Sequence, residues 1–228
     1  MRLERQLITV LAAALFFYSC SVLPGIVSNA QYEFDQGLAL FNSGKYQDAV
    51  PRFQRAIELD ANFGRAYLYL GRSYVSLRSW GKALPPLRQA YQLAPDETKR
   101  EVVNILVDAL FSFGLDALRT GDFVSAIDSF KEILGLQPTS AQGRSELVRA
   151  LVAHGGKLLA QGNVSQAISS YTEAVKLAPA NFEAIFGLAR AFFRNGDYSK
   201  ALQAAEDATR VSPSNRDLQS FMQDLRKR

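Results

Sequence analysis

The sequence predicts an all-α solenoid of five helix-turn-helix units followed by a C-terminal capping helix. Three observations predict this fold. An alanine followed by a hydrophobic residue recurs at intervals of 34, 43, 41 and 34 residues, at Ala49, Ala83, Ala126, Ala167 and Ala201. A short turn element precedes each of these alanines, and a proline (Ala61 in the first unit) follows each by 12 residues. Such a period is typical of stacked repeats, so we expect a function in partner binding.

Residues 1–30 resemble an export segment. Arg2 and Arg5 precede an uncharged, mostly apolar stretch over 7–27, and the small residues Ser28 and Ala30 fit a signal-peptidase site. We therefore expect cleavage after Ala30. Two alternatives remain open: lipidation at Cys20, the only cysteine, and retention as a membrane anchor, because about 20 apolar residues can span a bilayer. All three interpretations predict an exported, periplasmic or membrane-associated protein of the cell envelope.

The predicted array covers residues 31–215. Its units are 30–63, 64–97, 107–140, 148–181 and 182–215. Each unit has two helices joined so tightly that they must be antiparallel, and close packing then requires small residues between them. One position of the first helix supplies them: Gly37, Gly71, Gly114, Gly155 and Ala189. We expect the marker alanines to face these small residues, and bulky core residues to recur nearby on the second helix at Phe53, Leu87, Phe130 and Tyr171.

Two insertions, 98–106 and 141–147, interrupt the period. Apolar stripes run from each insertion into the first helix that follows it, for example through Val102 and Leu106. Both insertions are therefore predicted to extend helices. They either project at one edge of the array, where they would make a specific contact, or pack on each other.

The last segment, 216–228, reads as the capping helix. Asn215 can cap its start, and an apolar stripe follows at Leu218, Phe221, Met222 and Leu225. Such a helix covers the open end of a repeat array.

The marker alanines, turn elements and terminal prolines together resemble tetratricopeptide repeats (TPRs). The resemblance implies a right-handed α-solenoid whose first helices line a concave groove. Some positions depart from the pattern. Glu33 and Gln36 replace large apolar residues in the first unit, which suits a terminal repeat, and the only histidine, His154, takes a large apolar position.

Chemical motifs are scarce. A lone histidine and a lone cysteine do not make an ordinary zinc site, and no glycine-rich phosphate loop, zinc-protease helix or nucleophile elbow appears. A net charge of +4 is too mild to indicate nucleic-acid binding. We expect a protein that is not an enzyme, with no catalytic residues, cofactor or metal.

The resemblance places recurring first-helix residues in the groove. The apolar ones are Phe34, Leu38, Phe41, Leu68, Val75, Phe111, Leu115, Leu118, Val152, Leu159, Phe186 and Phe193, with Tyr69 beside them. The basic ones are Arg65, Arg72, Arg119, Arg149, Arg190 and Arg194. Aromatic anchors surrounded by arginine are typical of peptide-binding surfaces, so the predicted partner is an amphipathic protein segment carrying Asp or Glu. Self-association and simple packing are the alternative uses of these side chains.

The predicted function is accordingly a non-catalytic protein-protein interaction scaffold of the cell envelope. The alternatives are an accessory or regulatory subunit of an envelope enzyme or secretion complex, and a self-assembling structural protein. In the scaffold hypothesis Arg72 and Arg190 are exposed, so that changing them to Glu would weaken partner capture without changing the melting temperature.

Overall fold

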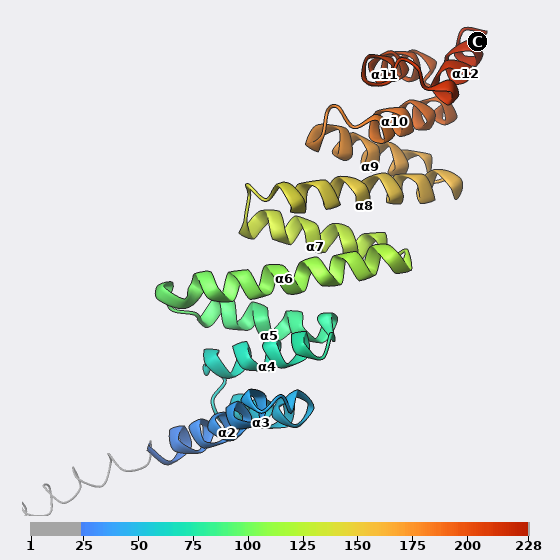
Figure 1. Cartoon of the computed structure of the whole chain (residues 1–228). Helices are drawn as coiled ribbons and strands as arrows, with labels where there is room; N and C mark the ends of the chain where they lie inside the picture. Colours follow the sequence, from blue (N-terminus) through green and yellow to red (C-terminus); the bar gives the residue numbers. More distant parts are fainter. Residues whose placement is uncertain (1–23, 228) are drawn as a thin grey trace, which may run out of the picture. The chain divides into compact units, whose positions relative to one another are not determined.

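The structure, a computed structural model, describes residues 24–227, with side chains described from residue 29 onward. The predicted lipidation site Cys20 and most of the predicted leader lie outside the described residues. Within 24–227 all regular structure is helical, and the helices follow one another as hairpins (Figure 1). The all-α helix-turn-helix fold is confirmed.

The chain divides into two compact units, residues 1–109 and 110–228. The first contains α2 (Pro24–Asn42), α3 (Tyr46–Leu59), α4 (Gly64–Ser76), α5 (Trp80–Leu93) and the start of α6 (Asp96–Thr120). The second contains the rest of α6, α7 (Phe123–Leu136), α8 (Ala141–Ala160), α9 (Val164–Leu177), α10 (Phe182–Asn195), α11 (Tyr198–Val211) and α12 (Arg216–Leu225).

The same turn closes all five hairpins. Four of the turns place a glycine in the left-handed region, with φ between 77° and 85°, at Gly44, Gly121, Gly162 and Gly196. The next residue donates its N–H to a carbonyl in the last turn of the preceding helix, as Lys45 does to Leu40 at 2.9 Å, which satisfies an otherwise unpaired helix-end carbonyl. The second hairpin has Arg78 at this position, at φ 52°, and the corresponding bond joins Ser79 to Tyr74.

The small first-helix residues are in close contact with the second helix, and the nearest atoms belong to its bulky core residues. A Cβ built on Gly37 would lie 2.8 Å from the ring of Phe53, and one on Gly114 would lie 2.8 Å from the ring of Phe130. The bulky residue one turn after the marker alanine therefore fills the space above the glycine, and a Cβ built on Gly71 would also lie 3.5 Å from the backbone oxygen of the marker Ala83. The marker alanines are fully buried beside it.

Each unit has its own apolar core. In unit 1 the cluster is centred on Phe34, Phe53 and Leu70, with Ala49 and Ala66 allowing the helices to approach. In unit 2 one cluster surrounds Tyr171. A second cluster joins α10 and α11 to the capping helix. Leu218 and Leu225 of α12 pack there on the small residues of α11, namely Ala201, Ala204, Ala205 and Ala208. The predicted second-helix positions Phe53, Leu87, Phe130 and Tyr171 are all buried, as expected.

Both insertions are helical. The first lies near the start of α6, and the second forms the start of α8, where Ser140 accepts a hydrogen bond from the Gly143 N–H at 3.1 Å. Val102, Leu106 and Leu147 are buried, so the apolar stripes of both insertions pack into their units. Each insertion also leaves an exposed polar face.

The capping helix forms as predicted. Asn215 accepts a hydrogen bond from the Leu218 N–H at 3.0 Å, and Leu218 and Leu225 are buried. At the other end, α2 is described from Pro24, and the predicted cleavage motif at 28–30 lies inside it. Across residues 24–227, no helix has both the length and the apolar character needed to cross a bilayer.

Candidate functional site

The first helices of unit 1 bring together half of the predicted groove aromatic residues, Phe34, Phe41 and Tyr69. Tyr69 of α4 is the centre of this group: its ring centroid lies 5.3 Å from that of Phe41 and 5.6 Å from that of Phe34, both in edge-to-face geometry. Such pairs add about 0.5–1.5 kcal/mol beyond the area they bury. Phe34, Phe41 and Tyr69 therefore form one continuous aromatic layer.

Two predicted arginines cover this layer. The guanidinium of Arg65 lies 4.8 Å from the ring centre of Phe34, and that of Arg72 lies 5.4 Å from Phe41 and 5.0 Å from Tyr69. Arg72 also forms an ion pair with Glu101 of α6 at 3.7 Å, and its side chain is 35% exposed. Contrary to the expectation of a freely exposed side chain, Arg72 packs against two rings and a carboxylate.

Phe34 is not available to a partner. Its side chain is fully buried, with Phe53, Phe63 and Tyr69 around it and Arg65 above it. The prediction of Phe34 as a groove anchor is therefore wrong, because the start of α4 closes over it. Leu159 of unit 2 is also buried, at 6% exposure, and does not line an open surface.

The capping helix covers the last predicted anchors. Phe221 of α12 lies 5.6 Å from Phe186 and 5.4 Å from Phe193, in edge-to-face contact with both rings. Both phenylalanines of α10 are consequently half-buried. Arg190 and Arg194 remain exposed beside them, and the Arg190 guanidinium lies 5.9 Å from the ring centre of Phe186.

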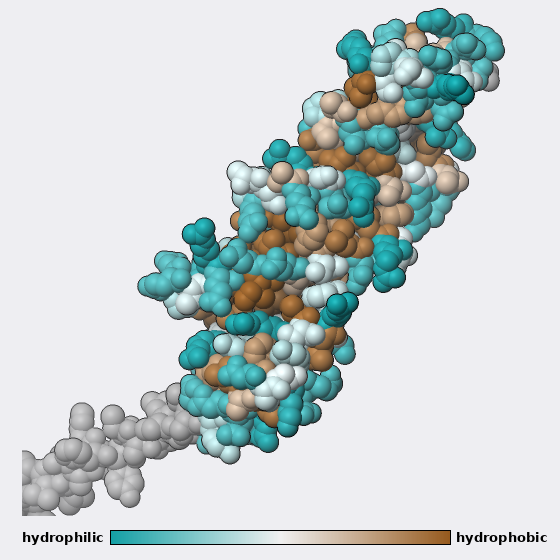
Figure 2. Space-filling view, viewed as in Figure 1, coloured by the Kyte–Doolittle hydropathy of each residue, from teal (hydrophilic) through white to brown (hydrophobic). Residues whose placement is uncertain are grey.

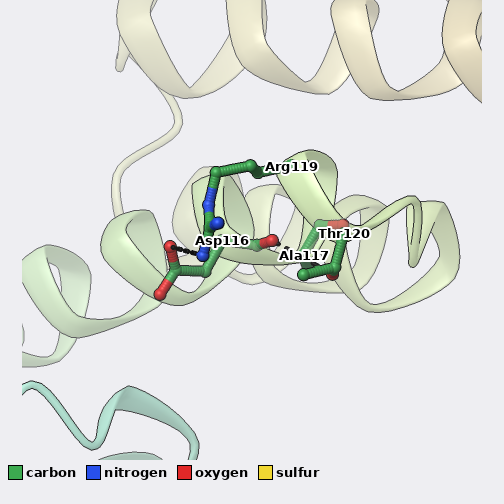
Figure 3. A network of polar contacts seen from close by, with 4 residues as sticks. All are labelled: Asp116, Ala117, Arg119 and Thr120. Carbon is green, nitrogen blue, oxygen red and sulfur yellow. Dashed lines mark hydrogen bonds and ion pairs between the residues drawn. The ribbon is translucent and has the colours of Figure 1, made fainter.

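Other predicted groove residues of unit 2 have partners other than Phe186 and Phe193. Phe111 of α6 packs edge-on against Phe130 at 5.8 Å and is half-buried. Arg149 forms an ion pair with Glu146 at 3.1 Å. Arg119 forms an ion pair with Asp116 at 3.5 Å (Figure 3). The hydroxyl of the neighbouring Thr120 donates to the backbone carbonyls of Asp116 and Ala117. The exposed Arg119–Asp116 pair contributes at most about 1 kcal/mol.

Two pockets adjoin these surfaces, one in each unit. The unit 1 pocket has a volume of about 370 Å³ and lies between the start of α4, the end of α5 and the start of α6. Predicted groove residues Arg65, Leu68 and Tyr69 line it, and Glu101 and Val102 of the first insertion complete its wall. Figure 2 shows apolar surface in brown at seams between neighbouring helices, bordered by polar side chains in teal.

The unit 2 pocket has a volume of about 520 Å³. It lies between the first half of α8, the end of α9 and the start of α10. Arg149 and Val152 line it together with Arg144 of the second insertion and with Glu183. Sequence reasoning missed the insertion residues of both pockets, although the broken period was a signal that these helices differ from the others.

His154 lies in unit 2 with its Nδ1 atom 3.4 Å from the Ser170 hydroxyl and its ring beside Phe123. Burial of the imidazole, and secondarily the charge of Lys157, lower the pKa of His154. Burial likewise raises the pKa of the Tyr171 phenol, and Arg190 opposes this shift. The described residues contain no group of three or more His, Cys, Asp or Glu side chains placed to hold a metal ion.

The hairpin array and its aromatic first-helix face define a helical-repeat protein. Two sequence profiles described as tetratricopeptide repeat match the chain, at residues 34–98 and 158–225, which together cover more than half of it. The chain is a tetratricopeptide-repeat protein, and it belongs to a class of protein-protein interaction scaffolds.

One solved structure with a TM-score above 0.5 supports the fold, and two others align with most of this chain. A TPR repeats protein from Bacteroides fragilis NCTC 9343 is 14% identical, with a TM-score of 0.58, over 87% of this chain and 98% of that one. The TPR domain of P58(IPK) is 22% identical, with a TM-score of 0.42, over 99% of this chain and 63% of that one. YrrB, described as a TPR protein with an unusual peptide-binding site, is 16% identical, with a TM-score of 0.36, over 84% of this chain and 90% of that one.

Proposed function

We propose that this protein is a non-catalytic scaffold of the cell envelope that binds an acidic, amphipathic segment of a partner protein on the first-helix face. The observation that carries the proposal is the unit 1 surface, where half-buried Phe41, Leu68 and Tyr69 lie beside Arg65 and Arg72. Aromatic rings next to guanidinium groups favour a ligand that combines apolar side chains with carboxylates.

The acidic character of the partner is supported by the state of the arginines. Arg65, Arg190 and Arg194 are exposed, and none of them forms an ion pair with another described residue. Guanidinium groups without an ion pair can donate two parallel hydrogen bonds to the carboxylate of a partner. Placement in the envelope is supported by the residues of the N-terminal segment, namely its two arginines, its apolar stretch and its small residues at 28 and 30.

The experiment is a crosslinked pull-down of the tagged full-length protein from membranes, with the intact mass of its N-terminus measured in the same sample. We expect a defined set of envelope proteins and a chain that begins at Gln31. A mass that shows a lipidated Cys20 or a retained Met1 would indicate that the scaffold is tethered to the membrane and not released by cleavage. Recovery of an unmodified protein from the cytosolic fraction would contradict placement in the envelope, and recovery of its own chain alone would favour self-assembly over the scaffold.

A further inference from the structure

The two insertions have a common consequence: each contributes the polar wall of a pocket. We propose that the unit 1 and unit 2 pockets are two sites at corresponding places in their repeats, each of which takes one large apolar side chain of a partner peptide and pairs the adjacent carboxylate with an arginine, Arg65 in unit 1 and Arg144 in unit 2. This inference rests on the proposed function and names the ligand chemistry of the first-helix face.

The pockets occupy the same place in their repeats. When the repeats 64–97 and 148–181 are aligned, Arg65 corresponds to Arg149 and Leu68 corresponds to Val152. Each of these four residues lines its pocket. The small residues Ala94 and Ala178 also correspond, at the ends of α5 and α9. The absence of a larger side chain at these two positions leaves the floor of each pocket open.

The insertions complete the walls in different ways. In unit 1 the insertion closes the far side with Thr98, Glu101 and Val102 at the start of α6. In unit 2 the insertion extends the near side with Arg144 and Ser145 at the start of α8. Volumes of about 370 and 520 Å³ fall in the range of small-ligand sites, which suits a single apolar side chain and its flanking backbone.

The charges of each pocket favour an anionic group. In unit 1, Glu101 is already paired with Arg72, whereas Arg65 has no ion pair with any described residue. An apolar ligand without a carboxylate would leave the Arg65 charge uncompensated at the rim.

Unit 2 has the same imbalance. Glu183 lies in the first turn of α10, where the helix dipole compensates a negative charge, and Arg149 is paired with Glu146. Arg144 only approaches the Pro138 carbonyl, at 3.5 Å, and forms no ion pair within residues 24–227. Each pocket therefore combines apolar walls with one arginine that lacks a carboxylate.

The test uses a minimal ligand, the capped dipeptide N-acetyl-Asp-Phe-amide, titrated into the full-length protein with labelled Leu and Val methyl groups. N-acetyl-Asn-Phe-amide is the matched neutral ligand. We expect saturable shifts of the methyl resonances of Leu68 and Val102 in unit 1 and of Val148 and Val152 in unit 2. The Asn ligand should bind about two- to fivefold more weakly, as the loss of one exposed ion pair implies.

Ala94→Trp and Ala178→Trp fill the pockets one at a time. Ala94→Trp should abolish the shifts in unit 1 and leave those in unit 2, and Ala178→Trp should do the reverse, so that each variant carries its own folding control. Gln92→Trp and Lys176→Trp, on exposed positions of the same helices, should change neither set.

Three results would overturn the inference: no saturable shift at either pocket, equal affinity for the Asp and Asn ligands, or unit 1 shifts that persist in Ala94→Trp. The proposed function fails separately. If the double variant Ala94→Trp/Ala178→Trp still captures its partner, the scaffold proposal stands and the pocket assignment falls. If the pockets bind the dipeptide but no partner is captured, the pocket assignment stands and the scaffold proposal falls.

Discussion

Tyr171 of α9 packs its ring directly on the backbone of Gly187 in α10. A Cβ built on Gly187 would lie 2.6 Å from Cζ of Tyr171, and one on Gly155 of α8 would lie 2.9 Å from the same atom. The ring is thus held between two first helices that have no side chain at the point of contact. This arrangement joins consecutive hairpins within unit 2, since a second-helix residue of one repeat contacts the first helix of the next.

Gly187→Ala should destabilise the protein by about 1–3 kcal/mol, because the methyl group overlaps a buried ring that cannot move aside. Gly156→Ala is the matched control. Its Cβ would meet only the Tyr171 hydroxyl, at 3.6 Å, and alanine is favoured over glycine in a helix by about 0.5–1 kcal/mol. Urea unfolding of both variants measures the difference. A Gly187→Ala protein as stable as the wild type would show that the ring is not confined.

Arg78→Gly should stabilise unit 1. Arg78 occupies the left-handed position that glycine takes in the other four hairpins, at φ 52°. A residue with a Cβ pays about 1–2 kcal/mol there, part of which is offset by the greater freedom of glycine in the unfolded chain. We expect a gain of about 0.5–1 kcal/mol in the free energy of unfolding. Arg78→Ala, which keeps the Cβ, should give no such gain; if it did, the loss of the arginine charge and not the backbone would be the cause.

Stability should depend on the protonation of His154. Its pKa is lowered in the folded state, so the unfolded chain binds a proton more readily. The stability contributed by the neutral imidazole is therefore fully present above the unfolded-state pKa of about 6.5 and declines as the pH falls toward the folded-state value. His154→Leu should flatten the dependence between pH 7 and pH 5, measured by chemical unfolding at each pH. An unchanged slope would assign the dependence to other groups.

Arg72→Glu should cost about 1–2 kcal/mol of stability. The change removes the contacts with Phe41 and Tyr69, worth about 0.5–1 kcal/mol at a partly exposed site, and places two carboxylates together at Glu101. Arg190→Glu, at an exposed position, should change stability by less than about 0.5 kcal/mol. Adding Glu101→Arg to Arg72→Glu should restore part of the loss. A double variant no more stable than Arg72→Glu would exclude the ion pair as a contributor.

The repeat period was sufficient to predict the hairpins, because small residues and turn glycines recur at the spacing that two packed helices require. The same period predicted burial of Phe53, Leu87, Phe130 and Tyr171. It did not reveal the role of Gly187, since that role depends on Tyr171 of the preceding repeat and not on the repeat that contains Gly187.

The predicted face was less accurate than the predicted fold. A position in the first helix does not show what covers it, so the burial of Phe34 under α4 and the contact of Phe221 with Phe186 and Phe193 could not be read from the repeat pattern. The pockets also depend on contacts made by the insertions, which have no counterpart in the repeat. Those contacts involve non-local packing that a single sequence does not specify.

Photo-crosslinking of the full-length protein in its own cells, with benzoyl-phenylalanine placed at one position at a time, tests whether a partner protein binds the first helices. Arg65 and Arg149 report on the first-helix face, and Gln92 and Lys176, also exposed, report on second helices of the same repeats. We expect discrete adducts with the same partner protein from Arg65 and Arg149, and none from Gln92 or Lys176. Equal adducts from all four positions, or adducts only with the protein's own chain, would contradict partner binding on that face.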